Sequence, residues 1–302
     1  MLTPDTRILI TGCGGMLGDA VYKTFNSICT IRATDIDLNE SWLSSLDVRD
    51  KEALEKEIRD FQPHYLFHLA ALTDVEFCET HPNEAFITNT IAVDNAAELC
   101  RKYDATMVYI STAGIFDGRQ DSYTDYDLPR PLSVYAQAKY AGEVFLRQFL
   151  QPRYFVFRAG WMMGGGPKKD KKFVNKVIKQ LACGKKELFV VEDKLGTPTY
   201  TNNFAENMRA VIDADAYGLY NMVCDGSCSR LDVAKEMMKI LGLEQKVKIT
   251  KVDSSHWQKE YFAPRPPSEK LIDWRLHAKG LHRMRDWREC LREYLTQYDW
   301  GI

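Results

Sequence analysis

The sequence of 302 residues predicts an α/β fold, a doubly wound parallel sheet with a smaller C-terminal α/β part. In the first half of the chain, short β-branched runs alternate with amphipathic stretches, which is the pattern of successive βαβ units. Crossovers between parallel strands are right-handed, so we expect helices on both faces of the sheet. A glycine-rich turn directly after the first predicted strand supports the same architecture.

The overall composition argues against several classes of function. The 40 Lys and Arg residues nearly balance 42 Asp and Glu residues, and a net charge of −2 does not suit binding to nucleic acid or to a membrane surface. No apolar run approaches the roughly 20 residues that span a bilayer. A strand pattern begins close to the first residue with no signal peptide before it, so we expect a cytoplasmic protein.

The eight cysteines are scattered and show no paired Cys-x-x-Cys spacing. We interpret them as reduced core thiols, as is usual in the cytoplasm. No cluster of histidines or cysteines in the sequence completes a metal site, so we expect none.

The turn Gly12-Cys-Gly-Gly-Met-Leu-Gly18 lies between a predicted strand at 7–11 and a predicted helix at 19–25. Glycines at 12, 15 and 18 permit a tight turn, close backbone approach to a pyrophosphate, and close packing of helix on strand. The helix that follows offers free N–H groups and a positive dipole end to the phosphates. We therefore predict a dinucleotide-binding Rossmann loop that includes Gly12, Gly15, Met16, Leu17 and Gly18.

The second predicted strand, 29–34, leads into Asp35. A carboxylate at the tip of this strand can accept hydrogen bonds from the adenosine ribose and would repel a 2′-phosphate. This favours NAD(H) over NADP(H). The alternative is that Asp35 and Asp37 only form a turn.

Two further strands are expected to bring small or polar residues to the carboxyl edge of the sheet, where open parallel sheets bind ligands. The strand predicted at 65–71 ends in Ala70 and Ala71, whose small side chains would let a cofactor pass close to the backbone. His68, within that strand, is interpreted as a buried core histidine. The strand at 106–110 ends in Ser111 and Thr112.

Tyr135-Ala-Gln-Ala-Lys139 lies in a helix that we expect to begin at Pro131 and to run to 149. Residues i and i+4 share a helix face, so the phenol and the ammonium can meet over one pocket. A nearby ammonium lowers the pKa of a tyrosine, which suits proton exchange with an alcohol or carbonyl near neutral pH. About one such pair is expected by chance in a chain of this composition, so an exposed pair without function is the alternative.

After a strand at 154–158 the alternation becomes irregular. Residues 161–166 have the composition of a loop, and the segment Lys168–Lys172 is interpreted as a solvated loop. A strand at 218–223 is expected to rejoin the main sheet. The other predicted elements are helices at 51–60, 82–103, 173–182, 203–213, 230–241 and 287–298, and a strand at 188–191.

Together these motifs resemble the extended short-chain dehydrogenase/reductases, and within them the dTDP-4-dehydrorhamnose reductase group. The likeness covers nearly the whole chain. Besides the glycine loop, its carriers are the segments 46–50, 69–76, 111–118, 135–143, 158–161, 196–199 and 263–266.

The resemblance implies an NAD(P)H-dependent reductase of the C4 keto group of a nucleotide-activated 4-keto-6-deoxyhexose. Tyr135 would be the general acid that protonates the C4 oxygen. Lys139 would lower the tyrosine pKa and hold the nicotinamide ribose, and Thr112 would hydrogen-bond the same sugar oxygen. A homodimer is compatible with the resemblance.

The resemblance also implies a division of the chain between cofactor and substrate. Residues 1–160, rejoined by 200–224, would bind NAD(P), and residues 161–199 with 225–302 would bind the nucleotide sugar. The implied cofactor-binding residues are those of the glycine loop with Asp35, Asp47, Val48, Leu69, Ala70, Ala71, Tyr135 and Lys139. The implied substrate-binding residues are Thr73, Val75, Thr112, Trp161 and Arg265.

The sequence departs from the family pattern at two places next to the implied site. The family usually has Asp-Tyr after the Ser-Thr pair, where this chain has Ala113-Gly114, and it has Asn where this chain has Lys172. A dehydratase would need acid/base carboxylates at the first place, so that activity is disfavoured. The alternatives are a nucleotide-sugar epimerase of the same fold and a non-catalytic cofactor-binding regulatory subunit, since the family includes a partner of methionine adenosyltransferase.

Overall fold

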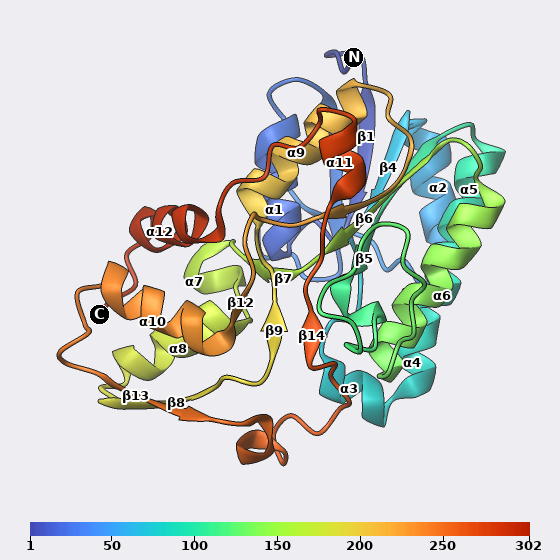
Figure 1. Cartoon of the computed structure of the whole chain (residues 1–302). Coiled ribbons are helices and arrows are strands. Elements are labelled where there is room, and N and C mark those ends of the chain that lie inside the picture. The colour runs from blue at the N-terminus through green and yellow to red at the C-terminus, as the bar shows by residue number, and fades with distance from the viewer.

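The computed structural model describes residues 1–302 and has a seven-stranded parallel sheet at its centre (Figure 1). The strands lie in the order β11-β6-β5-β4-β1-β2-β3, and every neighbouring pair is parallel. From β1 the chain first moves to one edge and then returns to build the other, which is the doubly wound arrangement and confirms the predicted fold class. The strands are β1 Arg7–Thr11, β2 Thr30–Asp35, β3 Ser44–Ser45, β4 Tyr65–His68, β5 Thr106–Thr112, β6 Tyr154–Ala159 and β11 Gly218–Met222.

Helices cover both faces of this sheet. Successive side chains of a strand point to opposite faces, and apolar side chains on both faces have to be buried. Ile8 and Ile10 of β1 pack into a cluster of 45 buried residues that includes side chains of two helices, α1 Met16–Phe25 and α9 Thr201–Asp213. Leu9 points the other way, into a second cluster of 18 buried residues. The helices on that face are α2 Lys51–Phe61, α5 Ala92–Lys102 and α6 Val134–Phe149. No helix in the chain has both the length and the apolar character needed to cross a membrane.

The rest of the chain forms three small sheets, mostly at the lower left and bottom of Figure 1. Two of these sheets are parallel pairs, β10 with β7 and β13 with β8, and in the third β9 lies between β12 and β14. Their strands are β7 Trp161–Met163, β8 Glu187–Val191, β9 Leu195–Gly196, β10 Pro198–Tyr200, β12 Cys228–Ser229, β13 Lys248–Val252 and β14 Ser268–Glu269. The accompanying helices are α7 Gly166–Lys169, α8 Phe173–Ala182, α10 Arg230–Ile240, α11 Trp274–Ala278 and α12 Trp287–Gln297.

Several predicted elements are confirmed at or close to their expected bounds. β11 rejoins the main sheet by pairing with β6, with Leu219 opposite Val156. Asp50 caps α2 by accepting a hydrogen bond of 3.0 Å from the Ala53 N–H. Ser229 begins α10 in a capping box with Asp232, so the local hydrogen-bonding signals identify these helix starts correctly.

Three local predictions were wrong. Residues 161–163 form β7 rather than a loop, because they pair with β10, which lies far away in the sequence. Pro131 does not begin α6, since the cap is Ser133, whose hydroxyl accepts from the Ala136 N–H at 3.3 Å. The strand expected at 65–71 ends at His68.

The helix expected at 82–103 is present but contains a π-helical turn, Ile87–Ile91, between α4 Pro82–Phe86 and α5. Asn89 lies in this turn, and its side chain both donates to and accepts from the backbone of Leu72 at 2.9 Å. The turn therefore ties this helix to the loop that follows β4.

A buried ion pair joins α6 to β6. The Arg158 guanidinium donates to both carboxylate oxygens of Glu143, at 2.6 Å and 3.1 Å, and both side chains are at most 1% exposed. Arg147 also approaches the same carboxylate, at 3.4 Å. A charge at this depth is stable only while it is paired.

We expect Arg158→Met to lower the free energy of unfolding by about 3–5 kcal/mol, because it leaves the Glu143 carboxylate buried without its partner. Urea unfolding of the purified protein measures this. The double variant Glu143→Leu/Arg158→Met should recover most of the loss, since it removes both charges. Equal instability of the single and double variants would show that packing rather than charge pairing is what matters here.

Candidate active site

The glycine loop lies at the carboxyl end of β1 and is too tight for side chains. Gly12 has φ of +70°, and a Cβ there would come within 2.4 Å of the Ala70 backbone nitrogen. A Cβ on Gly18 would lie 2.4 Å from the Cys13 carbonyl oxygen. Gly15 is the N-cap of α1, and no side chain caps that helix, so its first N–H groups stay available to an anion.

Asp35 stands beside this loop, at the end of β2. Its carboxylate accepts a hydrogen bond of 2.8 Å from the Gly14 N–H and another of 3.0 Å from the Asp37 N–H. The second bond is that of a turn former, while the first places the carboxylate against the loop where the phosphates are predicted to bind. Both of the roles considered for Asp35 are therefore compatible with its contacts.

The other residues implied for the cofactor lie at the neighbouring strand ends. The Leu69 N–H donates to the Thr11 carbonyl at 3.0 Å, which holds the end of β4 against β1 before the chain passes Ala70. Asp47 pairs with Arg49 at 2.6 Å, and this hydrogen bond holds the pKa of the Asp47 carboxyl below its usual value. Val48 next to it is buried.

Thr112, from β5, interacts with Tyr135, from α6, and Lys139 lies one turn further along the same helix. Thr112 is the last residue of β5, and its hydroxyl accepts from the Gly114 N–H at 3.1 Å. Tyr135 lies in the first turn of α6 and is partly exposed, whereas Lys139, one turn later, is only 4% exposed. The Lys139 ammonium sits over the Tyr109 ring, 4.0 Å from its centre.

The electrostatics of this group differ from the expectation that Lys139 lowers the pKa of Tyr135. Burial raises the pKa of Tyr135 to about 12, and only the interaction with Thr112 acts in the opposite direction. Burial also lowers the pKa of Lys139 to about 7, partly offset by Glu143. Desolvation determines the direction of both shifts, and the Lys139 ammonium faces the Tyr109 ring, so a lowering of the Tyr135 pKa by Lys139 stays a prediction.

His68 is a buried neutral histidine, as predicted. It is 1% exposed, and its Nδ1 lies 3.2 Å from the Thr11 hydroxyl. Burial, together with the charge of Lys139, lowers the pKa of His68 to about 3. The imidazole therefore carries no charge at neutral pH.

Two of the residues implied for the substrate, Trp161 and Arg265, come from the C-terminal part of the chain. The Trp161 indole N–H donates to the Glu269 carboxylate of β14. Arg265 forms a two-pronged ion pair with Glu76, at 2.6 Å and 2.8 Å, so it links its loop to helix α3 Val75–Thr80.

Thr73, between β4 and α3, receives hydrogen bonds from Lys172. The ammonium lies 3.2 Å from the Thr73 carbonyl oxygen and 3.3 Å from its hydroxyl. Val75, two residues later, is the first residue of α3. The structure thus brings these two predicted residues next to Lys172, one of the two positions at which the sequence departs from the family pattern.

The interpretation of Lys168–Lys172 as a solvated loop was right for the exposed Lys168 and Lys171 and wrong for Lys169 and Lys172. Lys169 is 6% exposed and its ammonium lies between two carboxylates, at 2.9 Å from Asp19 and 3.0 Å from Glu40. The preceding Gly165 packs so closely on α1 that a Cβ would lie 3.0 Å from the Met16 Cα. The segment therefore covers the N-terminal end of α1.

Arg230 and Glu269 belong to the site but carry no recognisable sequence signal. The Arg230 guanidinium stacks 3.6 Å from the centre of the Trp161 ring and 5.0 Å from that of Phe173. Burial lowers the pKa of Arg230 to about 10, so it remains a cation at neutral pH. Only the three-dimensional contacts with Trp161 reveal either residue.

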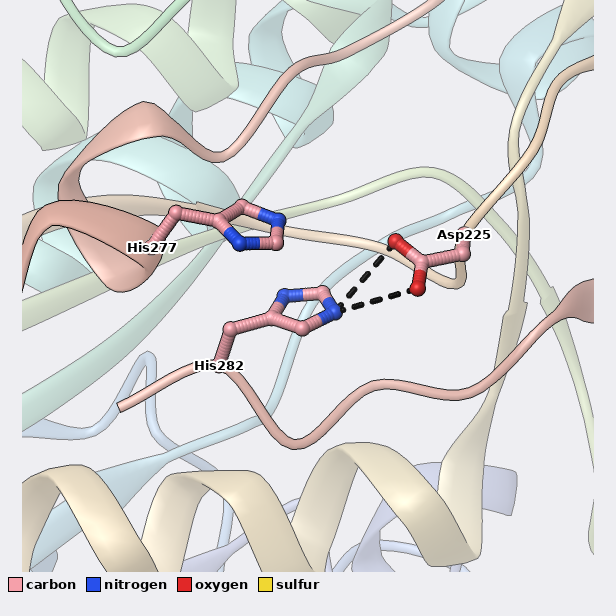
Figure 2. A group of neighbouring side chains, drawn as sticks. All are labelled: Asp225, His277 and His282. Atoms are coloured by element: carbon pink, nitrogen blue, oxygen red, sulfur yellow. Dashed lines mark hydrogen bonds and ion pairs between the residues drawn. The ribbon is translucent and has the colours of Figure 1, made fainter. Parts of the chain in front are cut away.

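A second polar cluster is formed by Asp225, His277 and His282 (Figure 2). Figure 2 shows the His277 and His282 rings stacked, with centres 4.0 Å apart, and Asp225 beyond their edges. His282 is held between two carboxylates, with Nδ1 2.6 Å from Asp273 and Nε2 3.3 Å from Asp225. No metal site was expected, yet Asp225, His277 and His282 each offer a ligand atom within 4.8 Å of the others.

Comparison with known proteins gives one family and several close structures. The chain matches the family described as RmlD substrate binding domain over residues 6–300. It is 30% identical over 295 residues to the spore coat polysaccharide biosynthesis protein SpsK of Bacillus subtilis, covering 97% of this chain and 98% of that protein. It is also 31% identical over 228 residues to methionine adenosyltransferase 2 subunit beta of Danio rerio, covering 72% of this chain and 69% of that protein.

Two solved structures share the whole architecture. A dTDP-4-dehydrorhamnose reductase from Clostridium acetobutylicum has a TM-score of 0.87 at 31% identity, covering 97% of this chain and 99% of that one. The dTDP-4-dehydrorhamnose reductase of Bacillus anthracis, in complex with NADP, has a TM-score of 0.87 at 28% identity, covering 97% and 100%.

The His282 cluster generates a prediction about stability and pH. The hydrogen bond to Asp273 raises the pKa of His282 in the folded protein. Its contribution is therefore fully present below the unfolded value of about 6.5 and is lost as the pH rises through the folded pKa. The free energy of unfolding of wild type minus that of His282→Gln should be largest at acidic pH and should shrink toward alkaline pH.

Urea unfolding at a series of pH values measures that difference. His256→Gln, at an exposed histidine outside the cluster, is the matched control and should give no such trend. A difference that stays constant with pH would mean that His282 contributes through packing alone.

Proposed function

Because the chain belongs to the family described as RmlD substrate binding domain, we propose that it is an NAD(P)H-dependent reductase of the C4 keto group of a nucleotide-activated 4-keto-6-deoxyhexose. The observation that supports the proposal is the interaction of Thr112, at the carboxyl end of β5, with Tyr135 of α6, on the edge of the parallel sheet where β1 leads into the glycine loop. The similar solved structures named as dTDP-4-dehydrorhamnose reductases support the same reaction class.

The glycine loop fits the pyrophosphate of a nicotinamide dinucleotide. Gly12 and Gly18 leave no room for a Cβ, and the uncapped start of α1 presents N–H groups and a positive dipole end. Ala70 and Ala71 continue this path toward Tyr135. When bound there, a nicotinamide cofactor supplies the hydride that reduces the carbonyl carbon.

Tyr135 is the group that supplies the proton. With a pKa of about 12 the phenol stays protonated at neutral pH, which is the form a general acid needs. Its O–H bond breaks as a new O–H bond forms on the sugar oxygen, which becomes negative as the carbon gains hydride. Thr112 donates a hydrogen bond to the same oxygen, and the partly exposed phenolate then recovers a proton from water.

Lys139 stabilises the phenolate that remains after proton transfer. Its pKa of about 7 means that it is charged in part of the molecules at neutral pH. An ammonium next to a phenolate favours the charged form of the tyrosine. Lys139 also lies one helical turn from Tyr135, where it is proposed to hold the nicotinamide ribose.

The substrate side of the site is proposed to be cationic. Arg230 stacks on Trp161 and Lys172 reaches Thr73, so two positive groups flank the predicted sugar pocket. They would bind the diphosphate of a nucleotide sugar. On this proposal residues 161–199 and 225–302 bind the nucleotide sugar, with Val75 and Arg265 as further lining residues, and residues 1–160 with 200–224 bind the cofactor.

The two alternative functions, an epimerase and a regulatory subunit, share the fold but differ from a reductase in the reaction that an assay would detect. An epimerase would change a sugar nucleotide with no net oxidation of NADH or NADPH. A regulatory subunit finds support in the likeness to methionine adenosyltransferase 2 subunit beta. The intact trio of Thr112, Tyr135 and Lys139 favours catalysis. Homodimer formation and a cytoplasmic location stay predictions from the sequence.

We expect Tyr135→Phe to lower kcat by about 100-fold or more, because it removes the proton donor, while affinity for NADH stays near that of wild type. The measurement follows cofactor absorbance with a panel of nucleoside-diphospho-4-keto sugars, and product analysis detects epimerisation. Tyr126→Phe, at a tyrosine that is 71% exposed, is the control. Wild-type kcat in Tyr135→Phe would exclude the acid role, and no cofactor oxidation by wild type with any sugar would overturn the reductase proposal.

We further propose that NADH is preferred to NADPH because the Asp35 carboxylate would repel a 2′-phosphate. Asp35→Asn keeps an acceptor for the Gly14 N–H but removes the charge, so the ratio of kcat/KM for NADPH to that for NADH should rise about tenfold. Asp37→Asn, exposed two residues later, should leave the ratio unchanged. A wild-type preference for NADPH would contradict this proposal, and a similar reductase has been solved in complex with NADP.

A further inference from the structure

We propose that Glu269 is a specificity-determining residue that accepts a hydrogen bond from the C3 hydroxyl of the sugar, next to the reacting C4 carbonyl, and that Gly114 provides the space for it. This inference rests on the proposed function and deepens it, because it concerns what the hexose must carry to be bound. It joins one of the two sequence departures, Ala113-Gly114, to a carboxylate that no sequence motif identifies.

Glu269 is held firmly in place. It lies in β14, paired with Gly196 of β9, and a Cβ on Gly196 would fall only 2.3 Å from the Trp161 ring. The close approach presses the indole against this strand pair. The indole N–H then donates to Oε2 of Glu269, which leaves the second carboxylate oxygen, Oε1, without that partner.

The free oxygen points toward the reaction centre. A Cβ on Gly114 would lie 3.2 Å from Oε1 of Glu269 and 3.5 Å from the Thr112 hydroxyl. Both oxygens therefore border the same point in space. Glu269 is also close enough to Tyr135 to raise the pKa of its phenol, which places the carboxylate beside the proton donor as well.

The absence of a side chain at Gly114 is what makes this arrangement fit. A Cβ at 3.2 Å is tighter than an ordinary contact, and any longer side chain would stand between Oε1 and the Thr112 hydroxyl. The carboxylate would then be displaced or covered. Because Gly114 has no side chain, the Glu269 carboxylate remains accessible to the substrate.

A carboxylate at this place would select sugars that carry a hydrogen-bond donor beside the keto group. It is an acceptor only, and C3, the ring carbon on one side of the C4 keto carbon, carries a hydroxyl donor, whereas C5 on the other side carries the ring oxygen and the methyl group. A sugar that lacks the donor leaves a partly buried carboxylate unpaired, and an acidic sugar meets a like charge. Arg230, on the Trp161 ring, balances the charge of Glu269 from a distance and does not remove its acceptor capacity.

The competing explanation is that Glu269 only anchors Trp161. Glu269→Gln separates the two roles, because the amide oxygen still accepts from the indole while the negative charge is lost. Isothermal titration calorimetry, with NADH present, would compare binding of a dTDP-6-deoxyhexose with binding of dTDP alone. We expect roughly 10-fold weaker binding of the sugar nucleotide to Glu269→Gln, and unchanged binding of dTDP.

Two comparisons sharpen the test. An analogue in which hydrogen replaces the hydroxyl next to C4 should bind wild type and Glu269→Gln equally. Gly114→Ala should weaken sugar-nucleotide binding in the same way, and the effects of Gly114→Ala and Glu269→Gln should be less than additive because they act on one contact. Glu244→Gln, at an exposed glutamate in the loop after α10, is the control.

The outcomes separate this inference from the proposed function. Equal loss of affinity for dTDP and for the sugar nucleotide, or no loss for either, would overturn the role of Glu269 even if wild type reduces a 4-keto sugar. A loss confined to the sugar nucleotide would support Glu269 even if no reduction is seen, in which case only the reaction class fails. A wild-type chain that binds no sugar nucleotide would overturn both.

Discussion

The buried ion pair between Glu143 and Arg158 is the constraint on which the site depends. It joins α6 to β6 where water cannot replace either partner, so the helix has one energetically acceptable position on the sheet. That helix carries Tyr135 and Lys139, and the strand beside β6 carries Thr112. The negative charge of Glu143 also raises the pKa of Lys139 and so partly offsets the lowering by burial. One buried pair therefore sets both the geometry and part of the charge of the catalytic group.

Desolvation explains why this group differs from a simple tyrosine–lysine pair. Water exclusion disfavours the phenolate of Tyr135 and the ammonium of Lys139 alike, and so drives their pKa values apart, to about 12 for the phenol and about 7 for the ammonium. The resting state is then rich in neutral phenol, ready to give up a proton. In the proposed mechanism the phenolate forms only when the sugar oxygen becomes a strong base, so stabilisation of the phenolate by the Lys139 ammonium would lower the barrier rather than the ground state.

The parts that the sequence predicted well are those that local physics determines. Strand runs such as 7–11, the glycine spacing that follows, and caps such as Asp50 and Ser229 depend on neighbours within a few residues. The failures are non-local. β7 exists only because β10 pairs with it, and Lys169 is buried only because Asp19 and Glu40 come from elsewhere in the chain. A composition of consecutive lysines cannot reveal partners about 130 to 150 residues away.

The site residues divide along the same line. Thr112, Tyr135 and the glycine loop were identifiable because their motifs have fixed spacing and sit at strand ends, where parallel sheets bind ligands. Arg230 and Glu269 were not, since each is defined by its contact with Trp161 rather than by its sequence neighbours. Gly114 is the hardest residue to recognise from the sequence, because it contributes only the space left by its missing side chain. A missing side chain at one position has meaning only when the structure shows that a carboxylate from a distant strand borders the vacated space, within reach of the Thr112 hydroxyl. On the proposal made for Glu269, substrate choice in this protein depends on a pair of positions, Gly114, which lacks a side chain, and Glu269, which supplies a polar group, and the function of neither can be recognised without the other.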